Sequence, residues 1–256
     1  MRWKWLITPT LVVFCTCQDR DPLVDPNIEE DVPLVFRELD FESTPRADAE
    51  AEAMALWLSG AFIAPDSTYQ VTHSALTLVR AQYGDSIAAV GSTQFSPPWM
   101  PGSLILHLMP DGRNALRHGK AEQLDSLNAW YHASMIDTSA LSYDFIFITF
   151  AGLLHPDSLS NVYRCAREVD SAGRNGIFHV YRCIYPVRLP SGLGLLYQLG
   201  FGDCPAGCSY YQYWYFHVHG GSVNYLGTFL SETDPTPGWW EEVASSKAAF
   251  CGDGNP

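Results

Sequence analysis

The chain has 256 residues, of which 47% are hydrophobic and 17% charged, so it can build a folded core and is not a disordered polypeptide. Its 28 acidic and 15 basic residues give a net charge of -13, which argues against binding to the phosphate backbone of a nucleic acid. The length fits one large or two small domains, and no apolar run reaches the roughly 20 residues of a membrane-spanning helix.

The N-terminal segment has the pattern of a secretory signal. Arg2 and Lys4 precede an apolar stretch at residues 5–14, and polar residues begin at Gln18. A positive start, a short apolar segment and a polar switch are typical of signal peptides, so we predict one at residues 1–16.

The end of this segment, Phe-Cys-Thr-Cys, resembles the lipobox of bacterial lipoproteins, in which a bulky residue and two small ones precede a lipidated Cys. The resemblance implies that Cys17 carries the lipid and anchors the protein to a membrane. It also implies the outer membrane or cell surface, because Gln18 replaces the Asp that favours retention at the inner membrane. Ordinary signal-peptide cleavage, giving a soluble periplasmic or secreted protein, is the alternative.

The sequence predicts an α+β fold: a ferredoxin-like split β-α-β core with an N-terminal helical pair and a C-terminal antiparallel β extension. Helices are expected at residues 47–58 and 66–83, from their content of good helix formers and their apolar spacing, with a short strand at 87–90. The predicted regions are a signal peptide (1–16), an acidic tether (17–45), a helical region (46–92), the ferredoxin-like core (93–190) and a disulfide-pinned β extension with tail (191–256).

The predicted core alternates strands and helices over about 85 residues. Strands are expected at 103–109, 143–150 and 176–187, and helices at 111–131 and from 157 onward. This order is that of a β-α-β-α-β unit, from which we infer the ferredoxin-like core.

Short motifs in this core resemble the propeptides of secreted subtilisin-type proteases. Pro101 and Gly102 open a strand, and Val169 and Ala172 precede Asn175 in the pattern V-x-x-A-x-x-N. The resemblance implies a module able to dock on a protease, although no catalytic domain follows it in this sequence.

The cysteines of an exported chain are expected to form disulfides. Cys204 and Cys208 flank a Pro-Ala-Gly bend that brings their sulfurs within bonding range. Cys165 with Cys183 is the best remaining pair, which leaves Cys251 odd; alternatively Cys251 pairs with either of them and ties the tail to the core. The alternatives are free or redox-active thiols, or a zinc site. Zinc would use Cys204, Cys208, His217 and His219, although about 30 Å of strand separates the cysteines from the histidines.

The strand at residues 209–219 is dense in aromatic side chains, and alternate residues share a face. One face is a ladder that we consider as a candidate binding surface, consisting of Tyr211, Tyr213, Tyr215, His217 and His219. The alternative is a sheet face that a neighbouring helix half covers. Gly220 and Gly221 predict a two-residue hairpin turn after this strand.

Known catalytic motifs are missing from the sequence: it has no G-x-S-x-G, no H-E-x-x-H, no P-loop, no dinucleotide-binding glycines and no calcium loop. We therefore predict a non-catalytic interaction or structural module that contacts another envelope or secreted protein, with no cofactor, metal or nucleic acid. The alternatives are a protease-docking, inhibitor-like module, and a hydrolase with a site around Asp203 and His217.

Overall fold

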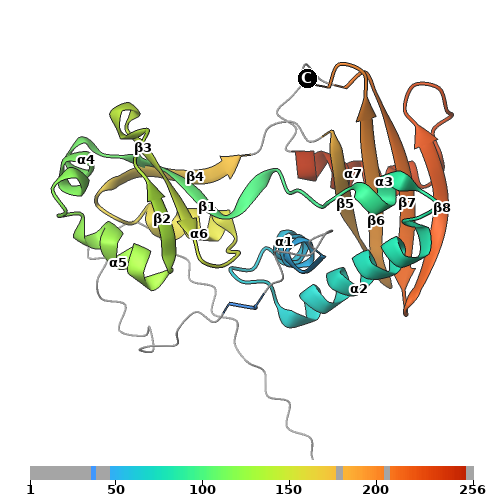
Figure 1. Cartoon of the computed structure of the whole chain (residues 1–256), viewed down its shortest axis with the longest axis horizontal. Coiled ribbons are helices and arrows are strands. Elements are labelled where there is room, and N and C mark those ends of the chain that lie inside the picture. Colours follow the sequence, from blue (N-terminus) through green and yellow to red (C-terminus); the bar gives the residue numbers. More distant parts are fainter. Residues whose placement is uncertain (1–35, 39–46, 177–180, 205–207, 252–256) are drawn as a thin grey trace, which may run out of the picture.

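A computed structural model describes residues 36–38, 47–176, 181–204 and 208–251 of the chain. Within these ranges the protein has seven α-helices and two antiparallel four-stranded sheets, which confirms the predicted α+β class. The sheets form two lobes that lie side by side (Figure 1). The signal peptide and nearly all of the predicted tether fall outside the described residues.

The first sheet has the strand order β2-β3-β1-β4, and every neighbouring pair is antiparallel. Its elements follow one another as a β-α-β-β-α-β unit, which is the ferredoxin-like topology expected for the core. Its strands are β1 (Trp99–Leu108), β2 (Ala133–Asp137), β3 (Phe145–Phe150) and β4 (Val169–Gly176). Its helices are α4 (Pro110–Arg117), α5 (Glu122–Trp130) and α6 (Pro156–Tyr163), with the 3-10 turn η1 (Leu141–Tyr143) before β3.

Three details of this lobe correct the sequence prediction. The helix expected at 111–131 is broken into α4 and α5, because Gly119 adopts a left-handed conformation (φ +63°) that ends α4. Strands β2 and β4 were not predicted. The strand expected at 176–187 does not complete this sheet, because β5 (Arg182–Leu189) pairs with β6 in the other one.

The second sheet is a meander in the order β5-β6-β7-β8. Strands β6 (Gly192–Phe201), β7 (Tyr210–His219) and β8 (Ser222–Leu230) match the predicted C-terminal extension. The turn between β7 and β8 is the predicted hairpin: Gly220 and Gly221 both have positive φ, and His219 pairs with Ser222 across it.

Helices cover both faces of the second sheet. Helices α1 (Ala47–Ser59) and α2 (Asp66–Tyr83) lie on one face, close to their predicted bounds, and α7 (Trp240–Cys251) lies on the other (Figure 1). Residues 88–92 form the short helix α3, which corrects the strand expected at 87–90. A buried ion pair of 2.6 Å joins Glu50 of α1 to Arg80 of α2. Arg80 also donates a hydrogen bond to the backbone carbonyl of Thr93. Burial raises the pKa of Glu50, and Arg80 opposes that effect.

Trp99 joins the two lobes. It begins β1 of the first sheet, yet its fully buried ring packs in the core of the second lobe beside Trp57 of α1. His155, at the start of α6, packs against the same indole with its ring centroid 5.2 Å away, and its backbone N–H donates to the carbonyl of Phe62 in the α1–α2 connection. Side chains of both lobes therefore meet at one apolar junction.

Candidate interaction surface

The tyrosine ladder of β7 lies beneath α7. Tyr213 and Tyr215 are fully buried: Trp240 packs edge-on against Tyr213, and Trp239 packs at a tilt against Tyr215. Tyr211 is half-buried, and His219 is exposed at the hairpin end. In this structure the face is thus a helix-covered sheet face, which was the alternative to a binding surface, and its middle is not open to a partner.

A small polar cluster fixes α7 to this face. Glu242 of α7 accepts a hydrogen bond from the hydroxyl of Tyr215, and its Oε1 lies 2.9 Å from Nε2 of His217. Burial raises the pKa of Tyr215, and the adjacent Glu242 carboxylate raises it further. The ammonium of Lys247, one turn farther along α7, lies about 6 Å from the ring centroids of Tyr211 and Tyr213. These contacts position α7 over the sheet.

The structure confirms the Cys204–Cys208 disulfide. It lies at the end of the β6–β7 hairpin, where Gly200 leaves room for the sulfur of Cys208: an added Cβ would come within 2.3 Å of it. Because each sulfur is bonded to the other, neither is a thiolate that could bind zinc together with His217.

The structure also separates the two residues of the hydrolase hypothesis. Asp203 follows Phe201, which pairs with Tyr210 at one end of the hairpin, whereas His217 pairs with Gly194 near the other end. Seven residues of strand, about 23 Å, lie between these two positions. The carboxylate beside His217 is that of Glu242, so Asp203 and His217 do not share a site.

Cys165 and Cys183 are not joined to each other, which corrects the predicted second bridge. Cys165 follows α6 in the first lobe, and its sulfur lies 3.5 Å from the carbonyl of Asn161. Cys183 is buried on β5 of the second lobe, 3.4 Å from the carbonyl of Ser96. The two cysteines therefore lie in different lobes. Cys17 lies outside the described residues, and the side chain of Cys251 is not described.

The outer face of the first sheet carries a row of aromatic side chains. Helices α4, α5 and α6 pack against the opposite face, through the even-numbered residues of β1 and β3. On the outer face Phe145 touches Tyr143 and Phe147 with ring centroids 6.4 and 5.5 Å away, and His107 of β1 lies 5.7 Å from Phe145. We call Ile105, His107, Tyr143, Phe145 and Phe147 the aromatic face.

No helix or strand of the described residues packs over the aromatic face. Tyr143 is 75% exposed, His107 is also exposed, and Phe145 and Phe147 are half-buried. Aromatic residues of this kind bring large apolar area at low entropic cost, which makes them frequent anchors of protein interfaces. The face is therefore suited to binding another protein.

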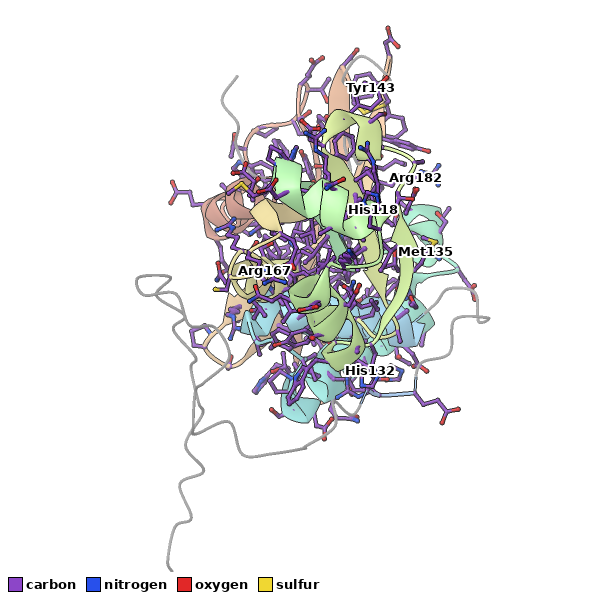
Figure 2. The ribbon with its side chains drawn as sticks, turned by 90° about the vertical axis from the view of Figure 1, so that its left-hand side faces the viewer. His118, His132, Met135, Tyr143, Arg167 and Arg182 are labelled. Carbon is purple, nitrogen blue, oxygen red and sulfur yellow. A yellow bond between two sulfur atoms is a disulfide. The ribbon has the colours of Figure 1, made fainter. Side chains whose placement is uncertain are left out.

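The edge strand β2 continues this surface. Nine large hydrophobic side chains are exposed in the described parts of the chain, and four of them fall within residues 130–143: Trp130, Met135, Ile136 and Tyr143. Figure 2 shows Met135 and Tyr143 at the surface of this lobe, with His132 at the start of β2. This concentration marks one region rather than scattered surface residues.

The sequence of β3 carries a signal for the aromatic face. Residues 143–150 read Tyr-Asp-Phe-Ile-Phe-Ile-Thr-Phe, so both faces of the strand are apolar. A strand that is apolar on both faces is expected to be buried on both. In the structure only the face of Ile146 and Ile148 is covered by helices.

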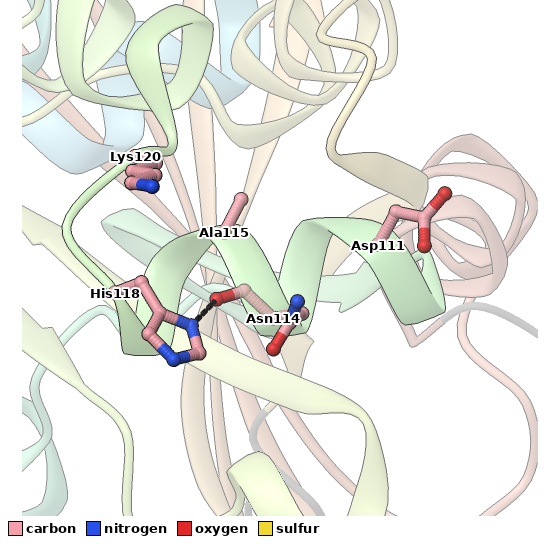
Figure 3. Close-up of a pocket in the computed structure, with 5 residues that line it drawn as sticks. All are labelled: Asp111, Asn114, Ala115, His118 and Lys120. Atoms are coloured by element: carbon pink, nitrogen blue, oxygen red, sulfur yellow. Dashed lines mark hydrogen bonds between the residues drawn. The ribbon is translucent and has the colours of Figure 1, made fainter.

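A pocket of about 430 Å³ lies on α4, away from this surface, and is lined by Asp111, Asn114, Ala115, His118 and Lys120 (Figure 3). Nδ1 of His118 lies 2.7 Å from the backbone carbonyl of Asn114 in its own helix. Asp111 lies at the other end of the helix from His118, so the pocket brings together no pair of groups suited to acid–base chemistry.

Comparison of the chain with protein-family models, with curated proteins and with solved structures finds no match. In the described ranges no helix is long and apolar enough to cross a bilayer. Within the same ranges, no three His, Cys, Asp or Glu side chains are grouped to hold a metal ion.

Proposed function

We propose that this chain is an exported, lipid-anchored envelope protein that binds another envelope or secreted protein through its aromatic face. The observation that carries the proposal is the row of Tyr143, Phe145 and Phe147 on a sheet face that no described helix covers. The Cys204–Cys208 disulfide supports an oxidising compartment, and the lipobox-like sequence before Cys17 supports the anchor. The role is one of binding, without catalysis.

Site-specific photo-cross-linking in a bacterial envelope tests this function. A benzoyl-phenylalanine at position 147 is expected to give a defined adduct that is lost when Phe145 is replaced by Lys. The same group at Val71, which is 52% exposed on α2 of the other lobe, is the matched control and should give none. Equal adducts from both positions, or none from position 147, would exclude the aromatic face as the binding surface.

The lipid anchor has a separate test. Mass spectrometry of the protein isolated from an envelope is expected to find a lipidated Cys17 at the N-terminus, and Cys17→Ser should move the protein to the soluble fraction. A mature form that begins elsewhere without lipid removes the anchor from the proposal. That result would not affect the proposal that the aromatic face binds a partner.

Docking on a secreted subtilisin-type protease is the second candidate function, and the strand order of the first lobe favours it. The two segments that resemble protease propeptides lie together in this sheet, because β1 pairs with β4. The side-chain amide of Asn175 on β4 also donates a hydrogen bond of 3.0 Å to the hydroxyl of Ser103 on β1. If the chain acts in this way, it should inhibit subtilisin itself, and Phe147→Lys should weaken that inhibition. Undiminished subtilisin activity at saturating protein would exclude this candidate.

A further inference from the structure

Among the described strands, none pairs with the free edge of β2. In the sheet order β2-β3-β1-β4 it is a terminal strand, and within the described residues it pairs with β3 alone. A terminal strand presents unpaired backbone N–H and C=O groups along its free side, which another extended chain can use. β2 is short, ends in Asp137 and has a register shift between Ala133 and Met135, but its sequence, Ala-Ser-Met-Ile-Asp, contains neither the Lys nor the Pro that often blocks such strands.

Apolar side chains are exposed on both faces of β2. Met135 pairs with Thr149 and points to the outer face, whereas Ile136 pairs with Ile148 and points to the helix side. Met135 is 56% exposed and Ile136 38% exposed. A partner that packed only on the aromatic face would cover Met135 and leave Ile136 in water. An extended segment beside β2 would place alternate side chains over both residues.

The charge around β2 indicates the kind of segment that fits. Residues 121–144 contain four carboxylates and no Lys or Arg. Glu122 and Asp125 are exposed on α5, and Asp137 is half-buried at the end of β2. Arg113 pairs with Asp144, and Arg167 lies 3.5 Å from Glu122, so four carboxylates face two arginines in this region. Basic residues that flank an apolar segment would complement the net negative charge that remains around β2.

From these observations we propose that the partner binds by strand addition: an extended, apolar segment with basic flanks pairs with the free side of β2. Backbone hydrogen bonds would supply much of the affinity, and the exposed Met135 and Ile136 would select the apolar side chains. The inference depends on the proposed function as a binding module and specifies how that module holds its partner.

The probe is a synthetic, end-blocked heptapeptide, Lys-Val-Thr-Val-Ile-Val-Lys, titrated into the full mature chain and followed by fluorescence anisotropy. Its matched control carries N-methyl groups on two adjacent central amides. Because adjacent N–H groups of an extended peptide point to opposite edges, each edge loses one backbone hydrogen-bond donor, while the side chains are unchanged. Strand addition predicts at least tenfold weaker binding of the methylated peptide. It also predicts slower hydrogen exchange of the amides of residues 134–137 when the unmodified peptide is bound. Equal affinities of the two peptides, or no binding of the unmodified one, would overturn the proposal.

Variants of the protein give a second measurement. Met135→Ser combined with Ile136→Ser should weaken peptide binding at least tenfold, whereas Val71→Ser, an equally exposed apolar site on α2, should leave it unchanged. If the double variant does not fold, the comparison of the two peptides on the unchanged protein still tests whether binding occurs by strand addition.

Two further outcomes distinguish strand addition from the two alternatives, binding on the aromatic face alone and pairing with a second copy of the chain. If the cross-link at position 147 forms but the peptide does not bind, the binding module stands and strand addition is overturned. If light scattering finds a concentration-dependent dimer that the double variant abolishes, the free side of β2 pairs with a second copy of the chain and the proposed partner is wrong.

Discussion

Nε2 of His217 on β7 lies 2.9 Å from Oε1 of Glu242 on α7, which ties the second sheet to the helix that covers it. The same carboxylate accepts the hydrogen bond of the buried Tyr215 hydroxyl. One side chain of α7 thus satisfies two polar groups of a face that is otherwise aromatic.

Replacing Glu242 with Ala is expected to lower the free energy of unfolding by about 1–2 kcal/mol, because the Tyr215 hydroxyl then loses its acceptor beneath the helix. Guanidinium unfolding followed by tryptophan fluorescence measures the change. Glu241→Ala, at the exposed neighbouring position, is the control and should stay within about 0.5 kcal/mol of the parent. Equal losses in the two variants would mean that Glu242 does not hold the helix in place.

His155 is expected to make stability depend on pH at the junction of the lobes. Burial beside Trp99 lowers the pKa of its imidazole below the ordinary value of about 6.5, while Asp157 raises it and Arg174 lowers it. Below about pH 6.5 the unfolded chain therefore binds a proton that the folded protein does not bind. The free energy of unfolding should fall from about pH 6.5 toward the lower pKa of the folded state, with no contribution above pH 6.5.

His155→Gln should reduce that slope between about pH 6.5 and pH 5, measured by urea unfolding at a series of pH values. The carboxylate of Asp157 affects the free energy of unfolding in a lower pH range. Arg174 lowers the pKa of Asp157, so the stability that this carboxylate contributes is lost only below about pH 4. An unchanged slope in His155→Gln would contradict the assignment.

Gly112 is expected to be required in the first lobe. A Cβ at this position of α4 would lie 2.1 Å from the carbonyl oxygen of Glu168, a backbone atom that cannot move aside without shifting the start of β4. Gly112→Ala should therefore cost about 1–3 kcal/mol in thermal or urea unfolding. Gly173→Ala meets only the methyl of Ile105 at 3.8 Å and should change stability by less than about 0.5 kcal/mol. A Gly112→Ala protein as stable as the parent would show that α4 is free to move away from β4.

The Cys204–Cys208 disulfide closes a loop of five residues, for which the loop-entropy relation gives about 2 kcal/mol. The Cys204→Ser, Cys208→Ser double variant should lose about that amount in urea unfolding, and reduction of the parent protein should have the same effect. Cys165→Ser is the control, because Cys165 takes no part in this bridge. A midpoint that reduction leaves unchanged would contradict the prediction.

Local sequence predicted the parts of the fold that depend on local interactions. Helix formers and spacing placed α1 and α2, and Gly220–Gly221 placed the β7–β8 turn. Strand β4 could not be found in this way. Its sequence, Val-Asp-Ser-Ala-Gly-Arg-Asn-Gly, has little strand propensity, and it is extended because β1 provides a hydrogen-bonding partner.

The candidate site was less predictable for the same reason. Alternation correctly placed Tyr213, Tyr215 and His217 on one face of β7, but it carries no information on which helix covers that face. The aromatic face became recognisable only when the sheet order showed which side of Phe145 and Phe147 the helices leave open.

The first sheet is continuous in the chain, from residue 99 to 176, whereas the second lobe is assembled from what comes before and after it. A nascent polypeptide therefore contains every strand of the first sheet before any strand of the second has been synthesised. Helices α1 and α2 must wait for residues 182–230 before their apolar sides have a sheet to cover. The middle of the polypeptide is thus expected to fold before its beginning, so a chain that stops at residue 176 would hold one finished sheet and a set of helices with nothing to pack on.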